Sequence, residues 1–202
     1  MNDMYSYEKE IWNKGTLVLG TDEVGRGPMA GPLVAASVIL PKDCVIEGIN
    51  DSKKLSSKKR DELFEKISSL ALEIQTTFID EATVDKINVY QASKQAMLEC
   101  IKKSKLSFSH VLSDAMPLEG KFVNISLIKG DQKSVSIAAA SIIAKVTRDR
   151  YMIKLDEKYP QYGFKRNKGY ATKEHLEKLN EFGPCCIHRF SYSPVAKTFK
   201  KD

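Results

Sequence analysis

Four acidic residues stand at or just past the ends of apolar runs that predict strands. They are Asp22, Glu23, Asp114 and Asp131. Strand ends in an open α/β sheet converge on one edge, where ligands bind. Carboxylates gathered there repel one another unless they are protonated or share cations, and hard divalent cations such as Mg²⁺ prefer oxygen ligands. The set therefore indicates a metal site of the kind that supports two-metal phosphodiester cleavage, although any one acid alone is explained as well by a loop or a helix cap.

The glycines beside the first two acids indicate a phosphate ligand. In Gly25-Arg26-Gly27, glycine lets backbone N–H groups approach a phosphate closely, and Arg26 adds positive charge. The string GRGPMA also fits the dinucleotide fingerprint G-x-G-x-x-G/A. Pro28 and the strand predicted after it leave no phosphate-binding helix, so we discount that site. A tight hairpin loop explains the glycines equally well from spacing alone.

Basic side chains and a tyrosine favour a polyanionic partner. The formal net charge is +6, and clustered Lys and Arg side chains offer contacts to phosphates. A tyrosine among lysines offers a surface that stacks on a sugar or base. A solvated charged face would explain each of these residues taken alone. The candidates are Ser52, Lys53, Lys145, Arg148 and Tyr170.

Other chemistries are not indicated. The sequence has no GxSxG, GxxxxGK[ST] or HExxH motif. The pair Cys185-Cys186 with His188 lacks the spacing of zinc ligands, and the four cysteines are expected to be reduced thiols. No apolar run approaches the ~18 residues of a membrane-spanning helix, and the N-terminus lacks the pattern of a signal peptide. We therefore expect a cytoplasmic protein with no membrane partner.

The elements that must position these residues alternate as in an α/β domain with a mixed sheet. Apolar or β-branched runs predict five strands, and 3.6-residue periodicity with capping residues predicts the helices. No repeat or linker divides the chain, so residues 1–202 are expected to form one domain. The predicted strands are 16–24, 32–40, 73–79, 109–113 and 122–128, and the predicted helices are 56–72, 83–103, 134–159 and 172–182.

Taken in order, the motifs resemble those of ribonuclease HII, the type 2 ribonuclease H family. The most specific is the run GTDEVGRGPMAGP at residues 20–32, and the others continue along nearly the whole chain. Ribonuclease HIII usually carries a GKG-type variant and an extra N-terminal domain, so the GRG sequence favours HII. The further matching motifs are NDSKKL (50–55), DA (114–115), KGD (129–131), SIAAASIIAKVTRDR (136–150), YPQYGF (159–164), KGYAT (168–172) and HRFS (188–191).

The resemblance implies a fold and an activity. The fold would be ribonuclease H-like, with a central mixed five-stranded sheet flanked by helices and a small helical C-terminal part at about residues 171–202. The activity would be cleavage of the RNA strand of RNA–DNA hybrids and incision 5′ to single ribonucleotides in duplex DNA. Such an enzyme leaves 5′-phosphate and 3′-hydroxyl ends and serves in the removal of ribonucleotides and RNA primers from DNA. We expect a monomer whose partner is nucleic acid.

The resemblance also implies residue roles. Asp22, Glu23, Asp114 and Asp131 would hold Mg²⁺ or Mn²⁺. Gly25, Arg26 and Gly27 would hold the phosphate and read the 2′-hydroxyl, which distinguishes RNA from DNA. Tyr170 would stack on the deoxyribose 3′ of the ribonucleotide, and Ser52 and Lys53 would contact the phosphate backbone, with Lys145 and Arg148 as further substrate contacts.

One position departs from the family pattern. Asn167 stands before Lys168-Gly169-Tyr170 where the family often has His. The change removes a candidate proton carrier or phosphate contact but no metal ligand, so we expect activity to persist. Two other functions remain open at this point: a hybrid-binding module without chemistry, and a ribonuclease HIII-like enzyme that prefers long hybrids.

Overall fold

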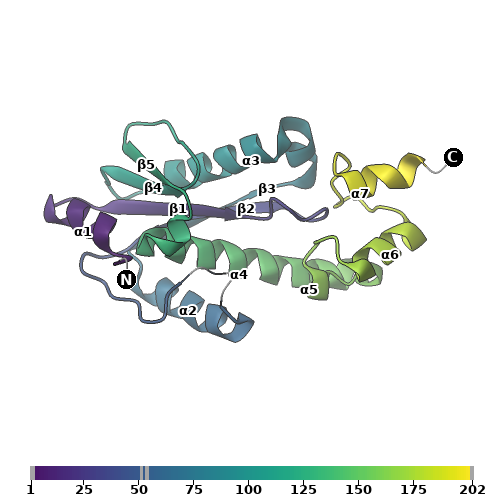
Figure 1. The fold of residues 1–202 in the computed structure, drawn as a ribbon, viewed down its shortest axis with the longest axis horizontal. Helices are drawn as coiled ribbons and strands as arrows, with labels where there is room; N and C mark the ends of the chain where they lie inside the picture. Colours follow the sequence, from purple (N-terminus) through teal and green to yellow (C-terminus); the bar gives the residue numbers. More distant parts are fainter. Residues whose placement is uncertain (1–2, 51, 53–54, 201–202) are drawn as a thin grey trace.

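The centre of the protein is one mixed sheet. A computed structural model describes residues 3–50, 52 and 55–200. Within them the strands pair in the order β3-β2-β1-β4-β5, with β1 antiparallel to β2 and parallel to β4 (Figure 1). This confirms the predicted five-stranded mixed sheet. The strands are β1 Val18–Val24, β2 Leu33–Ile39, β3 Glu73–Ile79, β4 His110–Asp114 and β5 Val123–Leu127.

Helices cover both faces of this sheet. Figure 1 shows α4 and α2 on one side and α3 on the other, while α5, α6 and α7 extend beyond one end of the sheet. Every residue of β2 is buried, because apolar side chains on both of its faces meet helices. The helices are α1 Ser6–Asn13, α2 Ser57–Leu70, α3 Glu81–Lys103, α4 Val135–Lys158, α5 Phe164–Asn167, α6 Lys173–Phe182 and α7 Ser193–Ala196.

The long helix α4 lies unusually close to β1. A Cβ atom placed on Gly20 of β1 would come within 2.2 Å of the Ser136 backbone carbon, so only glycine permits this approach. Small residues over 138–141 of α4 are buried in the same contact. The N-terminus of α4 is capped by Ser134, whose side chain accepts a hydrogen bond from the Ile137 N–H. The close contact places the middle of α4 directly beside the acids of β1.

The N-terminal helix α1 is an element that the sequence did not predict. Its Ile11 and Trp12 are buried in the core. The buried Glu8 carboxylate accepts hydrogen bonds from the Ser134 hydroxyl at 2.5 Å and the Ser136 N–H at 3.0 Å. Burial raises the pKa of Glu8, and these hydrogen bonds oppose that rise. Through Glu8, α1 therefore braces the N-terminus of the helix that packs on the candidate site.

Candidate active site

Three of the predicted acids come from neighbouring strands at one edge of the sheet. Asp22 and Glu23 come just before Val24, the last residue of β1, and Asp114 is the last residue of β4. The parallel register pairs Thr21 with Ser113, so Asp22 and Asp114 are the next residues on the two strands. Electrostatic repulsion from Asp114 acts on both Asp22 and Glu23. The strand register thus brings these three carboxylates together.

The fourth acid, Asp131, enters from a short 3₁₀ turn, Gly130–Gln132, after β5. The Gly130 N–H donates a 2.7 Å hydrogen bond to Asp114 Oδ1, which fixes this turn against the end of β4. Lys129 adopts the left-handed conformation, with φ of 57°, to make the turn. Asp131 is buried. The turn therefore places Asp131 next to a residue that is bonded directly to Asp114.

Burial and crowding make the acids of β1 hard to ionise. Burial, together with repulsion from Glu23 and Asp114, raises the pKa of Asp22 well above its usual range, and a hydrogen bond from Ser141 opposes the rise. Burial, helped by repulsion from Asp114, raises the pKa of Glu23 to about 7 although Arg26 counteracts it. Glu23 Oε2 is buried with no hydrogen-bond partner among the described residues. A positive charge beside these oxygens would offset both the cost of burying the carboxylates and the repulsion between them.

The carboxylates are not arranged around a common point. Among residues 3–50, 52 and 55–200, no group of three or more His, Cys, Asp or Glu side chains has the geometry to hold one ion. Other partners account for this: Asp22 Oδ1 accepts from the Glu23 N–H at 2.7 Å, and Glu23 Oε1 lies 3.4 Å from Arg26 Nη1. Asp114 Oδ1 is occupied by Gly130. The acids lie at the same end of the sheet, and their side chains would have to rotate to share an ion.

The GRG loop, residues 25–27, begins where β1 ends. Gly25 is buried, whereas Arg26 and Gly27 are exposed. Gly25 has φ of 99°, and a Cβ there would lie 2.7 Å from Arg148 Nε and 2.8 Å from the Pro32 carbonyl oxygen. Gly25 is therefore required both for its conformation and for its close packing. The loop presents an arginine and a glycine to solvent directly beside Glu23.

Arg148 does not occupy the substrate-facing position that the sequence suggested. Its side chain is fully buried. Nε donates to the Pro32 carbonyl at 2.8 Å, Nη1 to Lys168 at 2.9 Å and Nη2 to Ala30 at 3.1 Å. Burial and the nearby Arg189 lower its pKa to about 10. The guanidinium thus joins the residues after the GRG loop to the segment that carries Tyr170.

Tyr170 stands over the GRG loop. Its Cε1 would lie 3.7 Å from a Cβ on Gly27, and 40% of the residue is exposed. Lys145 Nζ lies 6.0 Å from the ring centroid. Lys145 also forms a 2.8 Å ion pair with Asp149, one turn along α4. The structure therefore brings the predicted residues Tyr170 and Lys145 together beside the loop.

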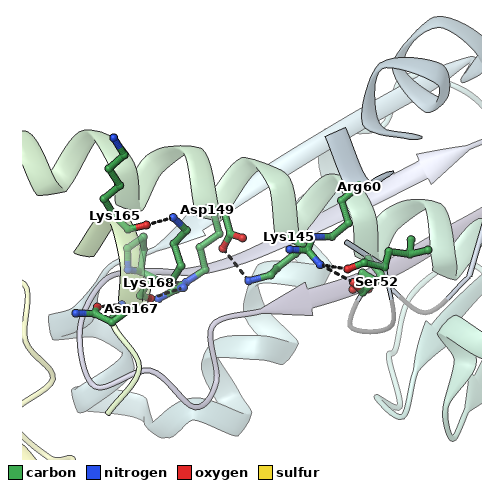
Figure 2. Close-up of polar contacts among 12 residues, drawn as sticks. Ser52, Arg60, Lys145, Asp149, Lys165, Asn167 and Lys168 are labelled. Carbon is green, nitrogen blue, oxygen red and sulfur yellow. Dashed lines mark hydrogen bonds and ion pairs between the residues drawn. The ribbon is translucent and has the colours of Figure 1, made fainter. Parts of the chain in front are cut away.

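Asn167 builds the turn that leads to Tyr170. Its Nδ2 donates to the Tyr162 carbonyl at 2.7 Å, and its Oδ1 accepts from the Gly169 N–H at 2.8 Å (Figure 2). Asn167 is buried. Gly169 has φ of 84°, and a Cβ there would come within 2.1 Å of the Ala30 carbonyl oxygen. The departure from the family's usual His therefore lies at a position whose side chain, in this chain, stabilises the backbone.

The predicted loop residue Ser52 lies inside the protein. It is buried, and its Oγ lies 2.9 Å from Ser141 Oγ of α4. Arg60 of α2 donates from Nη1 to the backbone carbonyls of Ser52 at 3.0 Å and of Leu55 (Figure 2). Lys53 lies outside the described residues. The sequence alone does not indicate the roles of Ser141 and Arg60, since a serine in an alanine-rich helix and an arginine in an exposed helix carry no distinctive pattern.

The fold, together with the group of acids at the strand ends, indicates an α/β nuclease of the ribonuclease H-like class. A sequence model of ribonuclease HII matches residues 19–195. The ribonuclease HII of Listeria monocytogenes is 53% identical over 199 residues, covering 98% of this chain and 76% of that protein. That of Bacillus subtilis is 52% identical over 194 residues, covering 96% and 76%. This chain belongs to the ribonuclease HII family, and is therefore a nuclease with endoribonuclease activity on RNA–DNA hybrids.

Solved structures agree with this assignment. The ribonuclease H2 of Pyrococcus horikoshii superposes with a TM-score of 0.79 at 26% identity, covering 92% of this chain and all of that one. The ribonuclease HIII called Bst-RNase HIII, solved with Mn²⁺, superposes with a TM-score of 0.73 at 16% identity, covering 92% and 70%. The second likeness shows the fold alone. Among the described residues, no helix combines the length and apolar character needed to cross a bilayer.

Proposed function

We propose that this protein incises duplex DNA 5′ to a single ribonucleotide, as well as cutting the RNA strand of RNA–DNA hybrids. We further propose that it uses two divalent cations, Mg²⁺ or Mn²⁺, held by Asp22, Glu23, Asp114 and Asp131. One observation carries the proposal. The buried Asp22 and the half-buried Glu23, with raised pKa values and an unpartnered Glu23 oxygen, lie directly beside the exposed Arg26 and Gly27.

The donor set fits hard divalent cations. All four side chains offer carboxylate oxygens, the ligands that Mg²⁺ and Mn²⁺ prefer. When bound, such ions would activate the attacking water and stabilise the departing 3′ oxygen of the preceding nucleotide. The related fold of Bst-RNase HIII was solved with Mn²⁺, which supports including Mn²⁺ beside Mg²⁺. Cation binding would also offset the burial and the mutual repulsion that raise the pKa values of Asp22 and Glu23.

The substrate is held by the chain's own groups. The exposed Arg26 and Gly27 would contact the scissile phosphate and the 2′-hydroxyl, and only ribonucleotides have the latter. Tyr170, above Gly27, would stack on the deoxyribose that follows the ribonucleotide. Lys145 lies near the Tyr170 ring and would contact a phosphate. Arg148, being buried, would act on substrate only through the carbonyls of Ala30, Pro32 and Lys168.

The products would be 5′-phosphate and 3′-hydroxyl ends, because in-line attack at the phosphate expels the 3′ oxygen on its other side. Such an activity would serve in removing misincorporated ribonucleotides and RNA primers during DNA replication and repair. We propose a cytoplasmic monomer as the working form.

Comparison of three substrates tests the proposal. The wild-type protein is incubated with a single-ribonucleotide duplex, a long RNA–DNA hybrid and an all-DNA duplex, each with Mg²⁺, with Mn²⁺ and with a chelator. We expect cuts 5′ to the single ribonucleotide, cuts in the hybrid, none in DNA, and none with the chelator. Cleavage of the hybrid alone would indicate an enzyme resembling ribonuclease HIII, and binding without cleavage would indicate a module without chemistry.

Two amide variants test the acids. Asp22→Asn and Asp131→Asn each replace a carboxylate by a group of similar shape that binds cations poorly. We expect each to lose cleavage by at least about a hundredfold while still binding the hybrid. Cleavage of the single-ribonucleotide duplex at the wild-type rate with Mg²⁺ would show that the residue is not a metal ligand.

A further inference from the structure

The HRFS motif, residues 188–191, lies against the segment that follows the GRG loop. The Arg189 N–H donates to the Met29 carbonyl at 2.8 Å, and the Gly31 N–H donates to the Ile187 carbonyl at 2.9 Å. Ala30 and His188 form an isolated antiparallel bridge between these contacts. The C-terminal segment is thus joined to residues 29–31 by backbone pairing, although about 160 residues separate them in the chain.

The Arg189 side chain extends this contact into the GRG loop itself. The residue is fully buried. Nε and Nη2 donate to the Gly31 carbonyl at 3.1 and 2.7 Å, which accounts for one edge of the guanidinium. Nη1 donates to the Arg26 carbonyl at 3.4 Å and to Tyr192 Oη at 3.0 Å. The other edge is therefore directed at the middle residue of the loop.

Tyr192 completes the contact. Its hydroxyl donates to the same Arg26 carbonyl oxygen at 2.5 Å, while its ring packs with its centroid 5.2 Å from Arg189 Cζ. The Arg26 carbonyl thus receives two donors from the C-terminal segment. A hydrogen bond from the guanidinium to the Tyr192 oxygen makes that hydroxyl a stronger donor, because linked hydrogen bonds polarise one another.

Holding the Arg26 carbonyl also orients the next N–H group. The peptide between Arg26 and Gly27 is planar, and no described peptide bond is cis, so its C=O and N–H vectors point in opposite directions. With the carbonyl turned inward to Tyr192 and Arg189, the Gly27 N–H is turned outward. Gly27 is exposed, and within the described residues its N–H makes no hydrogen bond to protein. Glycine has no side chain to resist rotation of this peptide, so the fixation must come from outside the loop.

We infer that Tyr192 and Arg189 are positioning residues for ribonucleotide recognition, because they fix the Arg26–Gly27 peptide with its N–H directed at the substrate. The inference rests on the proposed function, in which the GRG loop binds the scissile phosphate and the 2′-hydroxyl. Without the two donors the peptide would rotate between orientations, and the Gly27 N–H would be available to the ribonucleotide for only part of the time. Recognition of the ribonucleotide would therefore be weakened, whereas affinity for the duplex as a whole would not.

Tyr192→Phe is the decisive variant, because it removes only the hydroxyl and keeps the ring on Arg189. Ser191→Ala is its matched control: the Ser191 hydroxyl bonds Asp85 of α3 at 2.5 Å and does not reach the loop. For each protein, kcat and KM are measured on a single-ribonucleotide duplex, affinity is measured on an all-DNA duplex of the same sequence, and Tm is recorded.

For Tyr192→Phe we expect kcat/KM on the single-ribonucleotide duplex to fall about fivefold to tenfold, the range for loss of one hydrogen bond. Affinity for all-DNA duplex should stay within twofold of wild type, and Ser191→Ala should behave as wild type. If Tyr192→Phe cleaves as wild type, or if both variants lose activity equally, the inference is wrong. Failure of the wild-type protein to cut the ribonucleotide duplex would instead overturn the proposed function.

Arg189→Lys provides a second test, and its expected result differs from that of Tyr192→Phe. Lysine keeps the charge but replaces the planar fork by a single point donor, so the Gly31 contacts suffer as well as the Arg26 contact. We expect a lower Tm together with a larger loss of kcat/KM than in Tyr192→Phe. A lower Tm with kcat/KM unchanged below the melting range would show that the C-terminal segment only stabilises the fold, and would overturn the inference.

Discussion

Ser52 Oγ and Ser141 Oγ lie 2.9 Å apart, so Ser52 packs on the helix α4 beside the candidate metal site. The same Ser141 side chain hydrogen-bonds Asp22 and lowers its pKa, against the larger opposing effect of burial. Arg60 donates a second hydrogen bond to Ser52, at its backbone carbonyl. One serine hydroxyl, that of Ser141, therefore contacts both Ser52 and the candidate metal ligand Asp22.

Ser141→Ala should weaken cation binding without removing any ligand. Loss of the hydrogen bond raises the pKa of Asp22 further, so at a given pH a cation must displace a proton more often. We expect the Mg²⁺ concentration for half-maximal cleavage to rise about threefold to tenfold, and the defect to shrink as pH increases, because higher pH deprotonates Asp22. Mg²⁺ titrations at two pH values measure both effects.

Thr147→Ala is the control for that variant. Thr147 lies on the same helix but lines a pocket with Phe64 and Tyr151, away from Asp22. We expect its Mg²⁺ dependence to match wild type. An unchanged Mg²⁺ dependence in Ser141→Ala would show that this hydroxyl does not tune the site.

Glu23→Gln should stabilise the metal-free protein at neutral pH while abolishing cleavage. The folded-state pKa of Glu23, about 7, is above the ordinary value of 4.5. A raised pKa stabilises the fold fully below the unfolded-state pKa, and this stabilisation is lost as pH rises through about 7. The amide carries no charge to repel Asp22 and Asp114, so the variant escapes this loss.

Thermal melts with a chelator at pH 5 and pH 8 measure the effect. We expect Glu23→Gln to exceed wild type in Tm by roughly 5 °C at pH 8 and to match it more closely at pH 5. Added Mg²⁺ should raise the Tm of wild type at pH 8 more than that of the variant. Glu119→Gln, at a side chain that is 90% exposed, should change neither result. Equal Tm values for wild type and Glu23→Gln at pH 8 would show that the ionised Glu23 does not destabilise the fold.

Local patterns were sufficient to predict the sheet and the acids. Each strand is a short apolar run bounded by Gly, Pro or polar residues, and the acids stand at fixed places relative to those runs. Capping residues located two of the helices in the same way, since Ser56 and Ser134 each accept a first-turn N–H. The cap Asp80 was not recognised, and α3 begins at Glu81 rather than at the predicted Thr83. These signals extend over only a few residues, so they can be read before the fold is known.

Tertiary partners explain what the sequence did not predict. Arg148 resembles any basic residue of a helix, and its partners are backbone carbonyls, which carry no side-chain signature. The sequence shows only that Asn167 stands where the family often has His. What its side chain does depends on the Tyr162 carbonyl and the Gly169 N–H, to which it is hydrogen-bonded. The helix α1 was missed because its two apolar core residues, Ile11 and Trp12, are too few to establish a period.

Tyr170→Ala should reduce turnover of the single-ribonucleotide duplex more than it reduces affinity. The exposed ring lies above Gly27, where it would order the nucleotide after the ribonucleotide. Loss of a stacking surface typically costs about 1–3 kcal/mol, or roughly fivefold to a hundredfold, and we expect most of it in kcat. Tyr170→Phe should retain most of the activity, because the ring and not the hydroxyl provides the stacking surface.

Tyr151→Ala is the matched control. Tyr151 is 39% exposed, nearly the same as Tyr170, but it packs against Phe78 with ring centroids 5.2 Å apart. Single-turnover rates and binding isotherms for the three variants separate turnover from affinity. Wild-type turnover in Tyr170→Ala would remove this residue from the site.

A buried histidine pair should make the C-terminal part sensitive to acid. His175 Nδ1 lies 2.9 Å from the Tyr170 carbonyl oxygen and must donate to it, so Nε2 of His175 is an acceptor. His188 Nε2, 3.1 Å from His175 Nε2, is then the donor, and His188 Nδ1 accepts from the Cys185 N–H at 3.1 Å. Both rings are neutral in this arrangement, and a proton added at His175 Nε2 would face the donor Nε2–H of His188.

The direction of the pH effect follows from the pKa values. Burial and repulsion from His175 lower the pKa of His188 from 6.5 to about 4, and burial also lowers that of His175. A depressed pKa gives stability that is present above 6.5 and is lost as pH falls through about 4. We therefore expect Tm to fall between pH 6.5 and 4, with cleavage declining in the same range because His175 supports the Tyr170 carbonyl.

His188→Gln should lower Tm at pH 7 but flatten its dependence on pH, because glutamine does not titrate in this range and leaves His175 without a cationic neighbour. His110→Gln is the control, since His110 is outside the pair and bonds Ser109 Oγ at 2.6 Å. Its Tm should keep the wild-type slope below pH 6.5. Melts of the three proteins at half-unit pH intervals make the comparison. A slope in His188→Gln as steep as that of wild type would assign the acid sensitivity to other groups. Repeating the series in Glu23→Gln shows whether Glu23 is one of them.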